Sequence, residues 1–170
     1  MTITIDRIAG VRGYTIYQIG LHWLIAALVL AQLIFGDSMT ADIDAAEEGK
    51  QVSTLDGNLA GMHYYFGIAI LALVAVRLVL RLRNGVPLPP PETNGTLELA
   101  GRVSHGLFYG LLMVVPVTGL LGYYYGDPYG ELHTYAKPVF ISLIALHVAA
   151  SLYHKFWRKD GLLMRMFRPA

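Results

Sequence analysis

Six histidines are the residues of this sequence whose type and spacing could perform chemistry, and all lie within or beside long apolar segments. They are His22, His63, His105, His133, His147 and His154. The apolar stretch 130–157 holds three of them, the first two fourteen residues apart. Ionisable side chains inside hydrocarbon are costly, so histidines at such depth are candidates for function. A neutral imidazole there needs either a hydrogen-bond partner or a metal ion.

Four apolar segments are each long enough to cross a membrane, which takes about 20 residues. They cover 14–36, 62–82, 103–125 and 131–157. The chain has 170 residues, of which 55% are hydrophobic and 15% charged, so too little polar chain remains to cover four such segments in water. The sequence therefore predicts an all-α membrane protein, a four-helix transmembrane bundle formed as a single domain by residues 1–170.

The segments that join the apolar stretches differ in charge. One side, made of residues 37–61 and the short third connection, carries eight acidic residues and two lysines. The other side, with both termini and the 83–102 linker, carries eleven basic and four acidic residues. Basic loops remain in the cytoplasm. We therefore expect a multi-pass protein of the cell inner membrane with both termini cytoplasmic.

The histidine spacing indicates iron. Pairs of imidazoles from facing helices hold haem in a bundle without a covalent link, and the chain has no cysteine for a covalent haem or an iron–sulfur cluster. Fourteen residues make nearly four helical turns and rise about 21 Å, which places His133 and His147 on one face at opposite sides of the bilayer. Helix direction then pairs His22 with His147 near the cytoplasm and His63 with His133 near the outside. We expect two haem b groups, each with two histidine ligands.

A second pairing remains open. His154 follows His147 by seven residues, only about 10.5 Å along a helix, so two macrocycles held there would crowd each other. If His154 is the ligand, His22 pairs with His154 and His63 with His147, and His133 is left without a role at the outer surface. The first pairing gives the larger separation of the haems across the membrane.

Other residues are expected beside the inner haem. Arg77 lies fourteen residues after His63, where its guanidinium either pairs with a haem propionate or extends with Arg81 to the lipid headgroups. For His105 and His154 three roles compete: a hydrogen bond to a propionate, a contact with quinone, or axial ligation in place of His147.

Two glycines repeat the fourteen-residue spacing. Gly36 follows His22 by fourteen residues, and Gly119 follows His105 by the same number. A missing side chain at either depth would let a macrocycle approach the helix backbone. With 18 glycines in the chain, this coincidence is weak evidence.

Several motifs occur together over nearly the whole chain. They are IGLHWLIAALVL, MHYYFGIAILALVAVRLVLRL, the PVTGL end of the third segment, and the closing LH…YHKFWRKD. In combination they resemble the prokaryotic cytochrome b561 family, which is related to the cytochrome b subunits of nickel–iron hydrogenase and formate dehydrogenase. The resemblance implies a four-helix, two-haem electron conduit with ligands on the first, second and fourth helices, at positions that match His22, His63, His133 and His147.

We expect a di-haem b-type cytochrome of a respiratory chain that moves electrons across the cytoplasmic membrane, to or from the quinone pool, with ubiquinone as a candidate cofactor. Two alternatives are a superoxide:ubiquinone oxidoreductase and a cytochrome b anchor subunit of a dehydrogenase or hydrogenase; a haem-free span protein is a third. The acidic outer side repels superoxide and suits a basic periplasmic redox partner. Membrane lipid is the other expected partner, and nucleic acid is not expected.

Overall fold

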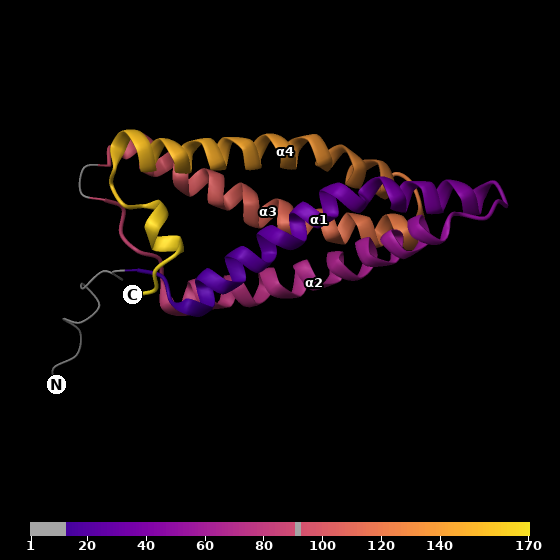
Figure 1. Ribbon diagram of the computed structural model, residues 1–170, viewed down its shortest axis with the longest axis horizontal. Helices are drawn as coiled ribbons and strands as arrows, with labels where there is room; N and C mark the ends of the chain where they lie inside the picture. Colours follow the sequence, from indigo (N-terminus) through magenta and orange to yellow (C-terminus); the bar gives the residue numbers. More distant parts are fainter. Residues whose placement is uncertain (1–12, 91–92) are drawn as a thin grey trace.

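The computed structural model describes residues 13–90 and 93–170, which form four long helices (Figure 1). They are α1 (Ile16–Glu47), α2 (Thr54–Asn84), α3 (Gly95–Tyr125) and α4 (Tyr129–Tyr153), followed by the short helical turns η1 (His154–Arg158) and η2 (Leu163–Met166). Each of the four is long and apolar enough to cross a membrane, and the described ranges contain no strand. The predicted all-α architecture with four spans is confirmed.

Local sequence signals mark the helix ends. Thr15, Ser53 and Asn94 precede α1, α2 and α3, and each side-chain oxygen accepts a backbone N–H from the first helical turn. Such caps satisfy donors that the helix itself cannot. Gly85 and Gly126 follow α2 and α3 with φ of 72° and 71°. These left-handed conformations favour glycine, so the chain turns sharply at both points.

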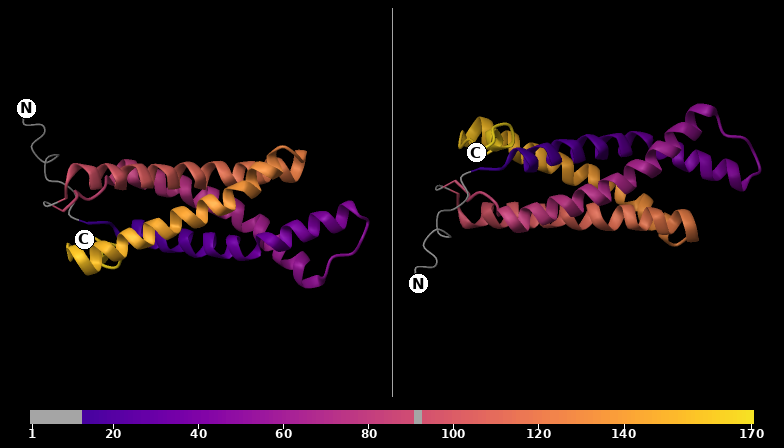
Figure 2. Two further views of the ribbon diagram at one scale, coloured as in Figure 1. Left: turned by 90° about the horizontal axis from the view of Figure 1, so that it is seen from above. Right: turned by 90° about the horizontal axis from the view of Figure 1, so that it is seen from below.

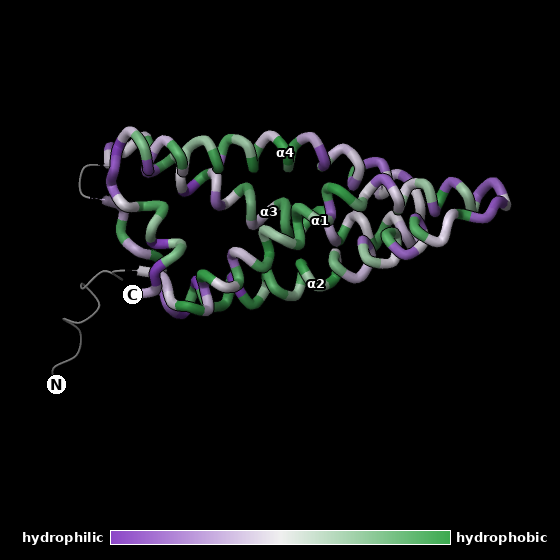
Figure 3. Tube along the Cα trace, viewed as in Figure 1, coloured by the Kyte–Doolittle hydropathy of each residue, from purple (hydrophilic) through white to green (hydrophobic). Residues whose placement is uncertain are grey.

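The first two helices extend well beyond the predicted spans. Residues 37–61, expected as a connection, are helical except for a short turn, because α1 continues to Glu47 and α2 begins at Thr54. Ala41, Ala45, Ala46 and Glu47 favour the continuation of α1. Ser38 also donates a hydrogen bond to Asp56 across the two helices (3.0 Å). The 32 residues of α1 rise about 48 Å, against a hydrocarbon core of about 30 Å. The hydrophilic tip of the α1–α2 hairpin therefore projects (Figure 3).

The helices pack as two antiparallel hairpins, α1 with α2 and α3 with α4, joined mainly through α2 and α3. Ile25, Ile70 and Val74 form the buried core cluster, in which Val74 is fully buried. Many other large apolar side chains remain exposed on the helices, as expected where lipid covers them. The hairpins lie apart at the end that carries the projecting tip in both views of Figure 2, whereas in Figure 1 they overlap there and separate toward the opposite end. We call the end with the projecting tip the outer end of the bundle.

The opposite, inner end holds both ends of the described chain (Figure 1). After α4 the chain folds back across this end, where the indole N–H of Trp23 donates to the Met166 carbonyl (2.9 Å) and the Ala170 N–H donates to the Tyr14 carbonyl (3.2 Å). The two described ends therefore lie on one side of the bundle. Residues 1–12, on whose charge the cytoplasmic assignment of the N-terminus partly depends, lie outside the described residues.

Asp160 fixes the reversal of the chain after α4. Its carboxylate accepts hydrogen bonds from Nδ1 of His154 (2.5 Å), from the backbone N–H of Leu162 (3.1 Å) and from Nε of Arg158 (3.3 Å). Burial by itself raises the pKa of Asp160, but the bonds from His154, Leu162 and Arg158 outweigh it, and the pKa lies below its ordinary value. The ionised carboxylate is therefore the form that holds the C-terminal segment in place.

We expect Asp160→Asn to loosen residues 159–170. A carboxyl group with a lowered folded-state pKa contributes stability that is fully present above its ordinary pKa of about 3.9 and is lost only as the pH falls through the folded value. At pH 7 the contribution is therefore intact. Hydrogen bonds to a charged group are worth about 1.5–3 kcal/mol, so the substitution should accelerate local opening by about tenfold or more. The measurement is the rate of tryptic cleavage after Lys159 and Arg165 at neutral pH.

The matched control is Asp42→Asn, which removes one carboxylate from the projecting part of α1 at the outer end. It should leave cleavage of the C-terminal segment at the wild-type rate. Equal cleavage of Asp160→Asn and wild type would contradict the anchoring role.

Candidate cofactor-binding site

Two histidines from opposite ends of the sequence meet near the inner end. His22 lies in the second turn of α1, and His147 lies in the inner half of α4. Their ring centroids are 6.4 Å apart, and the ring planes are inclined by 59°. Both side chains are partly exposed.

A second pair lies toward the outer end. His63 of α2 and His133 of α4 have ring centroids 5.9 Å apart and nearly perpendicular planes, at 86°. Because His133 and His147 are fourteen residues apart on α4, the two pairs are offset by about 21 Å along that helix. The helix thus presents one imidazole at each of two levels, and each faces an imidazole from another helix.

Both separations fit two imidazoles on opposite sides of one metal ion. With a metal–nitrogen bond of about 2 Å and about 1 Å more to the ring centre, the centroids of two axial imidazoles lie about 6 Å apart. The backbone of α4 packs on α3 and only sparsely on α1 and α2, so each pair joins helices that stand apart. Among the described residues no three His, Cys, Asp or Glu side chains gather as a metal centre made of protein ligands alone. The donor set therefore suits a planar macrocycle that supplies the other ligands.

His133 is held in one tautomer. Its Nδ1 lies 2.9 Å from the carbonyl oxygen of Val115 on α3. A carbonyl only accepts, so Nδ1 carries the hydrogen and Nε2 keeps its lone pair. A metal-ligating histidine has this arrangement, with the second ring nitrogen bonded to a backbone or side-chain acceptor.

His63 has a different environment. Its Nδ1 is buried without a hydrogen bond of ordinary geometry among the described residues, and the amide oxygen of Gln32 is buried in the same way. The amide nitrogen of Gln32 donates to the His63 backbone carbonyl (2.9 Å) and joins α1 to α2 at this level. A buried, unpaired ring nitrogen fits a position that a further group completes.

His105 and Phe108 of α3 lie beside the inner pair. Their ring centroids are 6.0 Å and 5.3 Å from that of His147. The side chain of His105 is exposed, unlike the other five histidines. Because α3 and α4 pack directly on each other, the space between them is narrower than that between α4 and α1. The structure thus brings His105 next to the inner pair, at the edge of the site.

His154 lies apart from this group. It follows α4, in η1, and its ring contacts Tyr153 and hydrogen-bonds to Asp160. No ring contact joins His154 to His22, or His63 to His147, among the described residues. The juxtapositions that the structure shows are those of the first pairing, His22 with His147 and His63 with His133.

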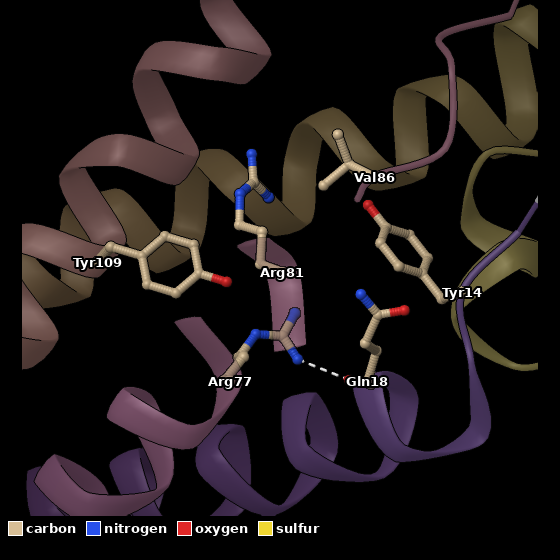
Figure 4. A pocket seen from close by; sticks show the side chains of 6 residues that line it. All are labelled: Tyr14, Gln18, Arg77, Arg81, Val86 and Tyr109. Carbon is tan, nitrogen blue, oxygen red and sulfur yellow. Dashed lines mark hydrogen bonds between the residues drawn. The ribbon is translucent and has the colours of Figure 1, made fainter. Parts of the chain in front are cut away.

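At the inner end, Arg77 lines a recess and lies next to α1 (Figure 4). The recess is lined by Tyr14, Gln18, Arg77, Arg81, Val86 and Tyr109. Arg77 donates from Nη1 to the Gln18 backbone carbonyl (2.6 Å), and the Arg81 guanidinium lies 5.6 Å from the centre of the Tyr109 ring. Neither guanidinium forms an ion pair with a carboxylate of the described residues. Two uncompensated cations in one recess suit an anionic group.

Sequence reasoning did not identify Gln18, Tyr109 or Val115 as site residues. Gln18 lies four residues before His22 and Tyr109 four residues after His105, so each is one helical turn from a histidine, and this spacing was the signal that could have found them. Val115 acts through its backbone carbonyl, which any residue supplies. Arg81 was noted only as a partner of Arg77 at the headgroups. The hint available for Val115 is its place immediately before the PVTGL motif.

Comparison with known proteins agrees with this architecture. The model of the family described as prokaryotic cytochrome b561 matches residues 13–169. The chain is 36% identical to "Cytochrome b562" of Cereibacter sphaeroides, over 92% of this chain and 96% of the relative. It is 25% identical to "Probable superoxide oxidase CybB" of Yersinia pestis, over 91% of this chain and 96% of the relative. With four spans, facing histidines and a family match along almost its full length, the chain belongs to the prokaryotic cytochrome b561 family, whose members are membrane electron-transfer cytochromes.

Proposed function

We propose that this protein is a di-haem b-type cytochrome that transfers electrons across the membrane, to or from the quinone pool. The observation that carries the proposal is the pair of facing imidazoles at each of two levels of α4, with centroid separations of 6.4 Å and 5.9 Å. His22 and His147 would hold the inner haem, and His63 and His133 the outer one. Haem iron supplies reversible one-electron transfer.

The chain's own part is to bind, orient and insulate. With one histidine on each side, a bound haem would leave no position for oxygen at the metal, which suits electron transfer. The offset of about 21 Å along α4 would separate two bound haems and divide the passage across the membrane into shorter steps. The apolar helices exclude water between the two levels.

The inner recess supports a role for Arg77 and Arg81 toward the propionates of the inner haem. Neither guanidinium pairs with a carboxylate within residues 13–90 and 93–170, and the recess includes Gln18, one turn before His22. Arg–carboxylate pairs are strong where water is scarce. His105 borders the same haem, where its exposed ring can donate to a propionate or contact a quinone. The bond between His154 and Asp160 supports a role for His154 outside the axial pair.

Charge supports the orientation and the type of partner. We infer that the inner end faces the cytoplasm and the α1–α2 tip the periplasm, because acidic residues predominate on the side of the tip and basic residues at the inner end. An acidic surface attracts a basic redox protein and repels superoxide. Superoxide oxidation remains the second candidate function, because one relative is named for that activity. The acidic surface disfavours superoxide as a substrate, so experiment has to decide between the two functions.

Single substitutions of the histidines test the ligand assignment. Each of His22→Ala, His63→Ala, His133→Ala and His147→Ala should lose one haem equivalent per chain, because one axial bond is removed. His154→Ala should retain both. The measurement is haem per purified protein with a reduced-minus-oxidised spectrum. Loss of a haem from His154→Ala with retention in His133→Ala would instead establish the alternative pairing.

Arg77→Gln tests the propionate recess. Loss of a nearby positive charge favours the ferric state, so the midpoint potential of the inner haem should fall by on the order of 50 mV, which is about 1 kcal/mol per electron. The outer haem should keep its potential. Arg83→Gln, which removes an exposed charge from the same end of α2 outside the recess, is the control. Equal effects of the two substitutions would contradict a specific role for Arg77.

The acidic tip is tested by ionic strength. Electron exchange with a cationic soluble cytochrome should slow as salt rises, because attraction between opposite charges is screened. A variant with Asp42→Asn, Asp44→Asn, Glu47→Gln and Glu48→Gln should exchange electrons more slowly and lose most of this salt dependence. Stopped-flow reduction measures both. Haem reduction by superoxide that is faster than exchange with the cationic protein, and coupled to quinone reduction, would favour the superoxide oxidase function instead.

A further inference from the structure

Helix α3 supplies no ligand in the proposed scheme, yet its outer half is shaped around His133. A Cβ atom built on Gly119 would lie 2.8 Å from both Cε1 and Nδ1 of the His133 ring. Carbon atoms do not approach ring atoms so closely without displacing them. The imidazole therefore rests directly on the α3 backbone, and the absence of a side chain at position 119 makes this position possible.

The same ring is fixed by a hydrogen bond one turn earlier on α3. The Val115 carbonyl accepts from Nδ1 of His133 at 2.9 Å and also from the hydroxyl of Thr118 at 2.9 Å. The two donors share one acceptor. Pro116 follows Val115 and has no backbone N–H, so it donates no hydrogen bond to the Leu112 carbonyl four residues earlier. The contact with Gly119 and the bond to Val115 together leave the ring one orientation.

Two further glycines, Gly122 on α3 and Gly130 on α4, let the start of α4 lie against α3. A Cβ on Gly122 would lie 2.9 Å from the backbone N and Cα of Gly130. The two backbones are thus in contact one turn before His133. This contact fixes the position along α3 at which the His133 ring packs. The close approach and the ring contact belong to one continuous surface of α3.

His63, which faces His133, is held in a looser way. A Cβ on Gly36 would lie 3.7 Å from Cε1 of His63, an ordinary van der Waals distance. Its Nδ1 makes no hydrogen bond of ordinary geometry among the described residues. Of the two outer histidines, one is therefore fixed by its neighbours and the other has room to adjust.

We propose that α3 is the positioning element of the outer haem. Gly119 and the Val115 carbonyl would fix the rotation and tautomer of His133, and Thr118 would moderate the ligand by sharing that carbonyl. The inference rests on the proposed di-haem function. An N–H···O bond at Nδ1 raises the basicity of the ligating nitrogen and so favours ferric iron. The Thr118 hydroxyl weakens this bond by competing for the same oxygen.

The first test compares two Gly→Ala variants. Gly119→Ala forces the His133 ring to move and should lose the spectral component that His133→Ala removes, one haem equivalent, while it keeps the other haem. The retained haem shows that the bundle has folded. Gly110→Ala, the matched control on the same helix, should retain both haems because nothing lies within 4 Å of its new methyl group. Two haems with wild-type spectra and potentials in Gly119→Ala would overturn the proposal.

The second test changes the hydrogen bond and keeps the space. Thr118→Val should retain both haems and lower the midpoint potential of the outer haem alone, because His133 then has the Val115 carbonyl without a side-chain competitor. Thr134→Val is the control, since that hydroxyl donates to the Gly130 carbonyl on α4 (2.7 Å) rather than to Val115. It should leave both potentials unchanged. An unshifted outer potential in Thr118→Val, or equal shifts in the two variants, would overturn the role of Thr118.

Failure of the proposal can be told from failure of the proposed function. Wild-type protein that binds fewer than two haems would overturn both. Wild-type protein with two haems, beside a Gly119→Ala variant that matches it, would overturn the positioning role alone.

Discussion

An imidazole inside a hydrocarbon layer cannot regain from water the interactions that it loses there. Four histidines of this chain meet that constraint in facing pairs. One member of each pair comes from α4, and the other comes from the α1–α2 hairpin. The same constraint requires that the backbone of α4 make only weak contact with that hairpin, as it does. Helices that packed closely at these levels would have no room for a group between the rings, and the imidazoles would have to pair with each other.

The two levels solve the problem differently. Near the inner end, charge surrounds the pair: two guanidiniums line a recess beside α1, and the exposed His105 borders His147. Near the outer end, shape and a single backbone carbonyl hold His133. One level is governed by electrostatics and the other by steric fit, so substitutions of equal size should affect the two levels unequally.

The spans could be predicted from the sequence because lipid selects apolar composition over a fixed length, and composition is local. Helical periodicity also predicted that His133 and His147 share a face, and the structure places them beside His63 and His22. Their role as ligands stays a prediction. Hydropathy marks where lipid begins but not where a helix stops, so the extension of α1 to Glu47 was not predicted.

Other features depend on contacts between distant parts of the chain. The C-terminal segment folds back through individual hydrogen bonds, such as that from Trp23 to the Met166 carbonyl. Such bonds produce no periodic pattern in the sequence. Gly119 was singled out by its spacing from His105 as a place where a macrocycle approaches a helix. The structure instead places the His133 ring against it. The spacing predicted the depth of Gly119 in the bundle, whereas the packing of the helices determines which group lies against it.

The unequal height of the two hairpins shapes the outer surface. α1 and α2 extend further at the outer end than α3 and α4, which join through the brief turn 126–128 (Figure 1). The result is a low ledge beside a tall acidic wall, and His133 lies one turn beneath the ledge. A redox protein that docked at this end would approach that histidine over the ledge, with one side against the wall. Its angle of approach would then be limited by relief as well as by charge.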